Sequence, residues 1–194
     1  MRRRLSAEQQ ERRQRVVEVA TRLATEGGYD AVVMKDVAEQ SGVALATLYR
    51  WFASKDHLLC EVLLEWGARL EADLRDAPPV EADGAARILE FVHRLSDTVA
   101  GFPRLASAVT RAVVSFEPSV LEHQDDFDAL VGRWIDLALG DLDVLDRATV
   151  IEVLEAVCFA NLIGLVGGRT TLADFGAKLE RAAQAVLAPA PLPH

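Results

Sequence analysis

Hydrophobic residues recur along the chain at the three- and four-residue spacing of amphipathic helices, and no segment shows convincing strand alternation. A Ser6-x-x-Gln9 capping box precedes the first apolar stripe, which Gly27 and Gly28 end. A longer stripe begins after Ser54 and continues to about Arg75. The pattern predicts an all-α fold.

The helical pattern resumes after the loop around Pro78 and Gly84. Prolines and glycines divide the remainder into further predicted helices, which cover residues 88–99, the stretch after Pro103, Pro118 to Gly140, about Arg147 to Val166, and Leu172 to Leu187. Three prolines in the last six residues predict a disordered tail over 189–194. We therefore predict a small N-terminal domain over residues 1–57 and a larger helical domain over 58–188.

Residues 36–56 have the pattern of two short helices joined by a tight turn. Val37 and Ala38 are the apolar neighbours of a first helix, and Gly42 supplies the positive φ that the turn needs. Val43, Leu48 and Phe52 follow at near-helical spacing, as a buried stripe would. Glycine-joined helical pairs also occur in proteins that never touch DNA, so this motif alone is weak evidence.

The opposite face of the second helix carries groups suited to DNA. Hydroxyl groups, a forked cation and an indole N–H are the group types that bond phosphates and reach base edges. A serine cap with a lysine in the first turn of the next helix also favours a phosphate. We assign to phosphates Thr47, Tyr49, Trp51 and Lys55, and to positions near bases Ala44, Leu45 and Arg50.

The segment from about Arg12 to Leu59 resembles the DNA-binding module of TetR-family transcriptional regulators. The resemblance is carried by Gly42, Thr47, Leu48, Tyr49, Phe52, Ser54 and Lys55. Trp51 departs from the Tyr or His often found at its position, and Ala44 departs from a frequent Ser. The resemblance implies a three-helix helix-turn-helix domain, a larger helical ligand-binding and dimerisation domain, and a homodimer joined through its last two helices. It further implies that the dimer represses transcription from a pseudo-palindromic operator in double-stranded DNA.

Within the family, the runs at 27–32, 47–52 and 108–114 resemble repressors of sterol catabolism. This implies a small hydrophobic effector such as a sterol CoA thioester, held in an apolar chamber of the larger domain. Each apolar residue there is also consistent with an ordinary core position. The residues predicted to line the chamber are Phe91, Leu95, Phe102, Leu105, Val109, Phe127, Leu130, Trp134, Phe159 and Leu162, with His93, Arg94, Arg111 and Asn161 as polar groups.

Charge is unevenly distributed along the chain. The net charge is -9, but residues 1–57 hold 10 Lys/Arg and 8 Asp/Glu, whereas residues 58–194 hold 11 and 22. Because salt screens charges within about 8 Å, the local excess of +2 matters most at a DNA groove. The acidic remainder should weaken non-specific binding.

Other features bound the function. Cys60 and Cys158 are too few for a disulfide framework or metal site, so we expect buried reduced thiols in a cytoplasmic protein. The apolar run 156–168 is shorter than the roughly 20 residues of a membrane span. No apolar stretch follows the N-terminal arginines Arg2, Arg3 and Arg4, so we expect no signal peptide.

The four histidines are scattered and no catalytic motif is present, so we expect no enzyme, cofactor or metal. An activator on the same fold and a multidrug-sensing repressor remain alternatives. Transcript levels in a deletion strain would distinguish an activator from a repressor. Ligand screening would distinguish a multidrug-sensing repressor from a repressor of sterol catabolism.

Overall fold

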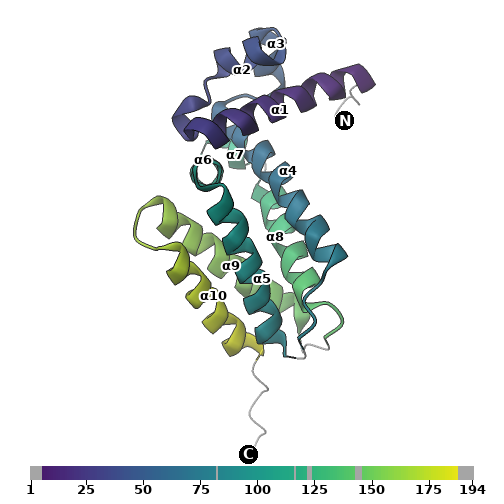
Figure 1. Cartoon of the computed structure of the whole chain (residues 1–194), viewed down its shortest axis with the longest axis vertical. Coiled ribbons are helices and arrows are strands. Elements are labelled where there is room, and N and C mark those ends of the chain that lie inside the picture. The colour runs from purple at the N-terminus through teal and green to yellow at the C-terminus, as the bar shows by residue number, and fades with distance from the viewer. Residues whose placement is uncertain (1–5, 82, 116, 122–123, 143–145, 188–194) are drawn as a thin grey trace, which may run out of the picture. The chain divides into compact units, whose positions relative to one another are not determined.

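The computed structural model describes residues 6–81, 83–115, 117–121, 124–142 and 146–187. These residues form ten α-helices and a short 3-10 segment, with no strand among them, so the predicted all-α fold is confirmed (Figure 1). In chain order the elements are α1 (Ala7–Gly27), η1 (Tyr29–Ala31), α2 (Met34–Ser41), α3 (Leu45–Trp51), α4 (Lys55–Asp76), α5 (Gly84–Gly101), α6 (Pro103–Val113), α7 (Pro118–Leu121), α8 (Gln124–Leu139), α9 (Arg147–Val166) and α10 (Leu172–Leu187).

The chain folds into two compact units that each combine separate stretches of sequence. Unit 1 contains residues 1–66 and 102–124, and unit 2 contains residues 67–101 and 125–194. Helix α4 is shared between them. This grouping differs from the predicted boundary at residue 57, because α6 contacts α1 and η1 and so joins the N-terminal unit. The N-terminal arginines Arg2–Arg4 and the predicted tail over 189–194 lie outside the described residues.

Helix α1 begins as its sequence predicts. The Ser6 hydroxyl accepts a hydrogen bond from the Gln9 backbone N–H, and the Gln9 side chain accepts one from the Ser6 N–H. The buried face of the helix consists of Val16, Val17, Ala20 and Ala24. After Gly27 the chain turns at Gly28, whose φ of 73° lies in the left-handed region that favours glycine. The capping box and the glycine stop are therefore confirmed.

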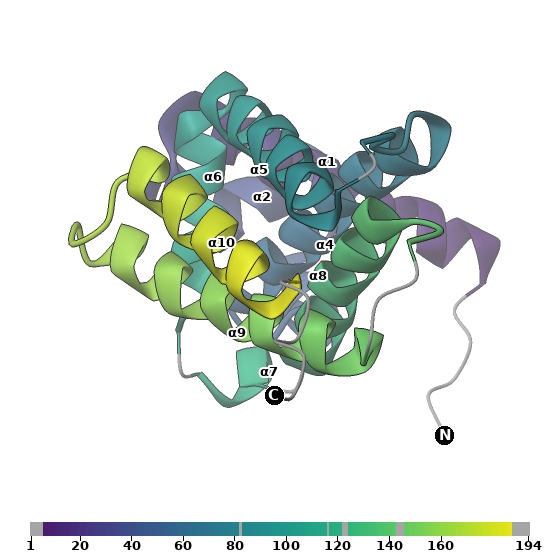
Figure 2. The ribbon, with the colours of Figure 1, turned by 90° about the horizontal axis from the view of Figure 1, so that it is seen from below.

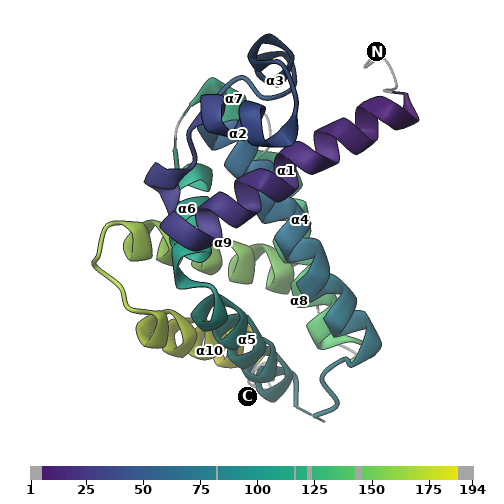
Figure 3. The same ribbon diagram turned by 45° about the horizontal axis from the view of Figure 1, so that its top comes forward.

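Helices α2 and α3 lie side by side, and α2 also contacts α1 (Figure 3). Gly42 has a φ of 69° and ψ of 25°, the left-handed conformation predicted for the turn. The Val43 N–H then bonds the Ala38 carbonyl at 3.0 Å, which closes the end of α2. The stripe of Val43, Leu48 and Phe52 is buried as predicted. The turn and this stripe fix α3 against the rest of unit 1.

Helix α4 starts at a side-chain cap. The Ser54 hydroxyl accepts from the His57 N–H at 3.1 Å, as the sequence indicated. In unit 2 the indole N–H of Trp134 donates to the Gly67 carbonyl of the same helix at 3.2 Å. Glu71, which is also buried, accepts hydrogen bonds from Arg75 and Arg133. Buried polar groups of α4 thus have partners.

The chain between Pro118 and Gly140 differs from the single helix that was predicted. It forms α7 and α8, and the two helices belong to different compact units. Val120 is buried in unit 1, whereas Phe127 and Leu130 are buried in unit 2. The common apolar spacing concealed the break because periodicity does not show which core a residue enters.

Unit 2 packs α10 against both α5 and α9 (Figure 2). We predicted from the sequence that no apolar run is long enough to span a membrane, and α9 shows that this prediction was wrong by length and composition. Its segment Arg147–Leu165 has 19 residues and a mean hydropathy of 1.8, enough by length and composition to cross a membrane. Counting uninterrupted apolar residues missed it because Glu152 and Glu155 divide the run. Only 28% of that segment is buried within the chain, so much of this apolar helix remains uncovered.

The left-handed turn at Gly42 generates a stability prediction. A Cβ built at Gly42 meets no atom within 4 Å, so Gly42→Ala should be destabilising through backbone conformation alone, by about 1–2 kcal/mol. Gly101 is the matched control, because it is equally uncrowded but lacks a positive φ. Gly101→Ala should leave the free energy of unfolding unchanged or slightly higher. Chemical denaturation measures both; equal effects would contradict this account of the turn.

Candidate functional site

Helix α3, the second helix of the predicted helix-turn-helix, exposes one face to solvent. Ala44 is its N-cap residue and makes no side-chain cap, and Leu45 is 40% exposed. Tyr49 is 49% exposed, Arg50 is exposed, and Thr47 and Trp51 are half-buried. The predicted DNA-contact residues of α3 therefore lie on or beside the exposed face, while Leu48 anchors the helix from below.

Lys55 differs from the others because its ammonium group already has partners. Its Nζ donates to the Tyr29 carbonyl at 3.2 Å and lies 3.7 Å from the centre of the Tyr29 ring. A cation over an aromatic face is held by the ring quadrupole. Lys55 thus fixes the start of α4 to η1, and its remaining donor capacity is what could reach a phosphate.

Tyr29 is a junction that the sequence reasoning missed. Its hydroxyl donates to the Oδ1 of Asp56 at 2.5 Å, and Asp56 is only 8% exposed. Burial, reinforced by this hydrogen bond, raises the pKa of Tyr29 to about 12, so the phenol keeps its proton at physiological pH. The run Gly27 to Val32 was noted for family likeness, but no spacing rule pairs residues 29 and 56.

Helix α6 contributes one arginine to this junction and bonds the end of α1 through a second. The Arg111 guanidinium lies 3.9 Å from the centre of the Tyr29 ring, and Arg104 donates to the Glu26 carbonyl at 2.5 Å. Arg111 was predicted as a polar group of the effector chamber. The structure instead places it in unit 1, where it contacts the tyrosine that also holds Lys55 and Asp56.

Most of the cations that the structure describes in unit 1 are engaged within the chain. Arg12, Arg13 and Arg22 make ion pairs with neighbouring glutamates. Three exposed cations have no such partner among the described residues, namely Arg15, Lys35 and Arg50. Lys35 was not among the predicted contacts, although its position in the first turn of α2 could have suggested it. Unpaired cations are the ones available to phosphates.

The predicted chamber residues fall in both units. Phe102, Leu105 and Val109 belong to unit 1, and the other seven belong to unit 2. Phe102 is exposed, whereas Leu95, Phe159 and Leu162 are half-buried and the remaining six are buried. Phe91 and Trp134 pack with ring centres 6.3 Å apart. These contacts are compatible with core packing as well as with the wall of a chamber.

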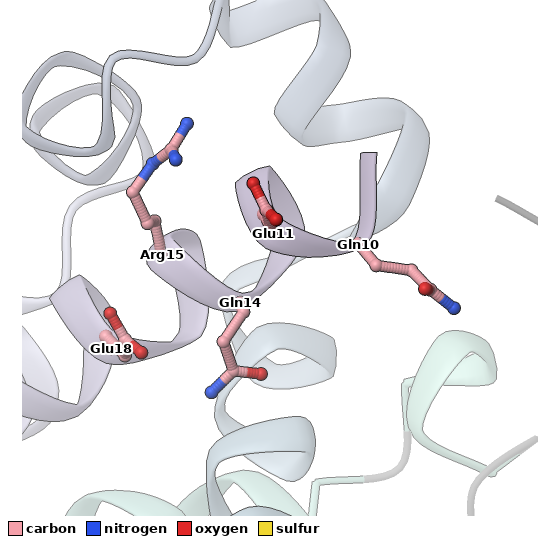
Figure 4. A pocket seen from close by; sticks show the side chains of 5 residues that line it. All are labelled: Gln10, Glu11, Gln14, Arg15 and Glu18. Carbon is pink, nitrogen blue, oxygen red and sulfur yellow. The ribbon is translucent and has the colours of Figure 1, made fainter. Parts of the chain in front are cut away.

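Two surface hollows lie elsewhere. One is lined by α1 alone, through Gln10, Glu11, Gln14, Arg15 and Glu18 (Figure 4). The other lies in unit 2 between α5 and α10, and His93 lines it. Neither includes one of the ten apolar residues predicted to line the chamber, although His93 is one of the polar groups predicted for it. Of the remaining predicted polar groups, Arg94 bonds Glu90 and the Ala77 carbonyl, and Asn161 donates to the Val157 carbonyl at 2.7 Å.

The cysteines are buried thiols, as predicted. Neither Cys60 nor Cys158 is in a disulfide. Burial raises the pKa of each thiol to about 12. Both groups are therefore protonated and poorly nucleophilic at neutral pH.

Comparison with known proteins gives consistent matches over both parts of the chain. A family model described as bacterial regulatory proteins of the tetR family matches residues 16–62, and one described as a tetracyclin repressor-like C-terminal domain matches residues 83–186. The HTH-type transcriptional repressor KstR of Rhodococcus jostii is 32% identical over 180 residues, covering 92% of this chain and 84% of the relative. These relatives are transcriptional regulators and not enzymes.

Two solved structures share the fold. A TetR transcriptional regulator from Rhodococcus sp. RHA1 superposes with a TM-score of 0.79 at 24% identity, covering 95% of this chain and 100% of that one. Thermus thermophilus FadR, a TetR-family repressor crystallised with lauroyl-CoA, gives 0.69 at 18% identity, covering 94% and 99%.

The Tyr29 junction predicts different roles for two tyrosine hydroxyls. Tyr29→Phe should lower the free energy of unfolding by about 1–3 kcal/mol, because it leaves the buried Asp56 carboxylate without its hydrogen bond. Tyr49→Phe removes an exposed hydroxyl that has no partner among the described residues, and it should change stability by less than about 0.5 kcal/mol. Chemical denaturation of the two variants compares them directly. A Tyr29→Phe protein as stable as wild type would refute the structural role.

Proposed function

Because this chain belongs to the TetR family of bacterial transcriptional regulators, we propose that it is a homodimeric repressor that a hydrophobic effector releases from its operator. The observation that supports this most strongly is the exposed face of α3, where Tyr49 and Arg50 have no partner within the part of the chain that the structure describes and the helix is fixed by the Gly42 turn. Such a protein would act on the chromosome in the cytoplasm.

The DNA contacts follow from which side chains are free. Arg50 and Lys35 offer unpaired cations, and Tyr49 offers a hydroxyl. Thr47 and Trp51, half-buried beside them, would donate to phosphates from the edges of the interface. Lys55 would act mainly by positioning α4 on Tyr29, with a phosphate as an additional partner.

The dimer proposal rests on the uncovered surface of α9. Its inner face is buried at Val150, Leu154 and Cys158, while the small residues Ala156 and Ala160 are exposed on the outer side. Small outer residues allow a second helix to approach closely, and burial against a second copy would cover an apolar helix without a membrane. Two recognition helices must also be held about 34–36 Å apart to meet successive major grooves.

The effector proposal combines the neighbours with the predicted chamber. Transcriptional regulators of this fold have been crystallised with lauroyl-CoA and stearoyl-CoA, and this chain resembles the KstR proteins over most of its length. We therefore favour an acyl or sterol CoA thioester, with the predicted apolar residues around its hydrophobic part. Thermal-shift screening of sterol and fatty acyl CoA thioesters against cationic dyes tests this against a multidrug-sensing function.

Release would act through α4, whose residues 55–66 belong to unit 1 and 67–76 to unit 2. An effector that tilts this helix would change the separation of the recognition helices, with a coupling free energy typically of about 1–3 kcal/mol. Recovery of bound fragments across the genome would identify the operator and the regulated genes. Transcript levels after deletion of the gene would distinguish a repressor from an activator.

The proposed phosphate contacts predict a salt-dependent effect. Arg50→Ala should weaken binding to a selected operator and reduce the slope of log affinity against log salt by about 1 if Arg50 contacts a phosphate. If Arg50 instead bonds a base, Arg50→Ala should lower the affinity and also relax the preference for that base in the operator. Arg169→Ala, which removes an exposed arginine between α9 and α10, is the control and should change neither. Fluorescence anisotropy at several salt concentrations gives both quantities. Unchanged binding in Arg50→Ala would contradict the assignment.

The dimer surface predicts a separation-of-function variant. Ala160→Glu places a charge on the exposed outer side of α9 without disturbing its buried face. It should convert the dimer to a monomer in analytical ultracentrifugation and weaken operator binding strongly, because each half-site is then bound alone. Ala129→Glu makes the same change on the exposed side of α8 and should leave the dimer intact. A dimeric Ala160→Glu protein would exclude this surface as the interface.

A further inference from the structure

The leading end of the recognition helix carries no polar side chain. The turn and first residues of α3 read Gly42, Val43, Ala44, Leu45 and Ala46. Val43 is buried, but the other four are exposed, and Leu45 is 40% exposed. In helix-turn-helix proteins the N-terminal residues of the recognition helix are the ones that contact base edges. In this chain the base-facing position is therefore occupied by aliphatic groups.

Aliphatic groups restrict what can be read. They cannot form the paired hydrogen bonds by which Arg recognises guanine or Asn recognises adenine. Only one base presents an apolar group to the major groove, namely thymine with its C5-methyl. Placing Leu45 against a phosphate would instead remove water from a charge without replacing its hydrogen bonds. The apolar side chain and the methyl group are each other's most favourable partner.

We infer that Leu45, flanked by Ala44 and Ala46, is a specificity-determining residue that recognises the C5-methyl group of a thymine in each operator half-site. This rests on the proposed DNA-binding function and deepens it. The side chain is open for this contact because it packs in no core of the described chain, unlike Leu48 one turn further on. The flanking alanines are short enough to let Leu45 approach the floor of the groove. Thr47, two residues later, is half-buried, and the next fully exposed polar side chains, Tyr49 and Arg50, begin a full turn after Leu45.

A double-mutant cycle between protein and DNA tests the inference. An operator is first selected from a randomised duplex pool with the full-length wild-type protein. Each thymine is then replaced, one symmetric pair at a time, by deoxyuridine, which lacks only the methyl group. At one pair, wild-type affinity should fall about fourfold per half-site, the effect of one lost methyl contact. Binding by Leu45→Ala should be weaker overall but indifferent to that replacement. Restoring the volume of the methyl with 5-bromodeoxyuridine should restore affinity for wild type only.

The control is Leu121→Ala, which removes a leucine of similar exposure, 47%, in helix α7 outside the helix-turn-helix. It should keep the wild-type response to every deoxyuridine. Because both leucines are exposed, the melting temperature of each variant should stay at the wild-type value, which separates lost recognition from lost folding.

The outcomes separate the two levels of the proposal. If an operator is selected but wild type and Leu45→Ala respond equally to every deoxyuridine pair, the inference is wrong and the DNA-binding function stands. If no duplex is enriched by the wild-type protein, the proposed function fails and the inference fails with it. The assignment is supported only by a thymine whose replacement with deoxyuridine lowers the affinity of the wild-type protein and leaves the affinity of Leu45→Ala unchanged.

Discussion

The aromatic ring of Tyr29 is the point on which unit 1 depends. The Lys55 ammonium and the Arg111 guanidinium both lie over this ring, while the Tyr29 hydroxyl donates a hydrogen bond to the buried Asp56. Through these contacts η1 is joined to the start of α4 and to α6. The positive charges of the two cations offset the negative charge of the carboxylate around one ring, so η1, the start of α4 and α6 are held together within unit 1.

Local rules predicted the helix-turn-helix well because its determinants are close together in the chain. The Ser6 and Ser54 caps, the left-handed Gly42 and the buried stripe through Leu48 each involve residues within a few positions. The Tyr29 junction could not be predicted in the same way. Its other members lie 26 to 82 positions from Tyr29, and Arg111 has the appearance of any polar group on an amphipathic helix.

The larger domain shows the opposite balance. Periodicity placed α9 and α10 closely, yet it merged α7 with α8 because both stripes have the same spacing while entering different cores. Burial does not distinguish a residue of the predicted chamber from an ordinary core residue, whereas exposure does single out the predicted DNA-contact residues of α3. An aromatic side chain such as Phe91 has the same pattern in a packed core and in the wall of a chamber. Exposure is informative for α3 because an uncovered Leu45 or Tyr49 has no packing explanation.

The composition of unit 1 from two stretches of sequence has a practical meaning for engineering. A fragment cut after residue 66 would lose α6, and with it the Arg111 and Arg104 contacts to η1 and α1. Unit 1 therefore cannot be transplanted onto a different second domain by a single junction. A functional chimaera would have to carry residues 102–124 along with the N-terminal segment, so recombination that exchanges only the first third of the gene should yield poorly folded products.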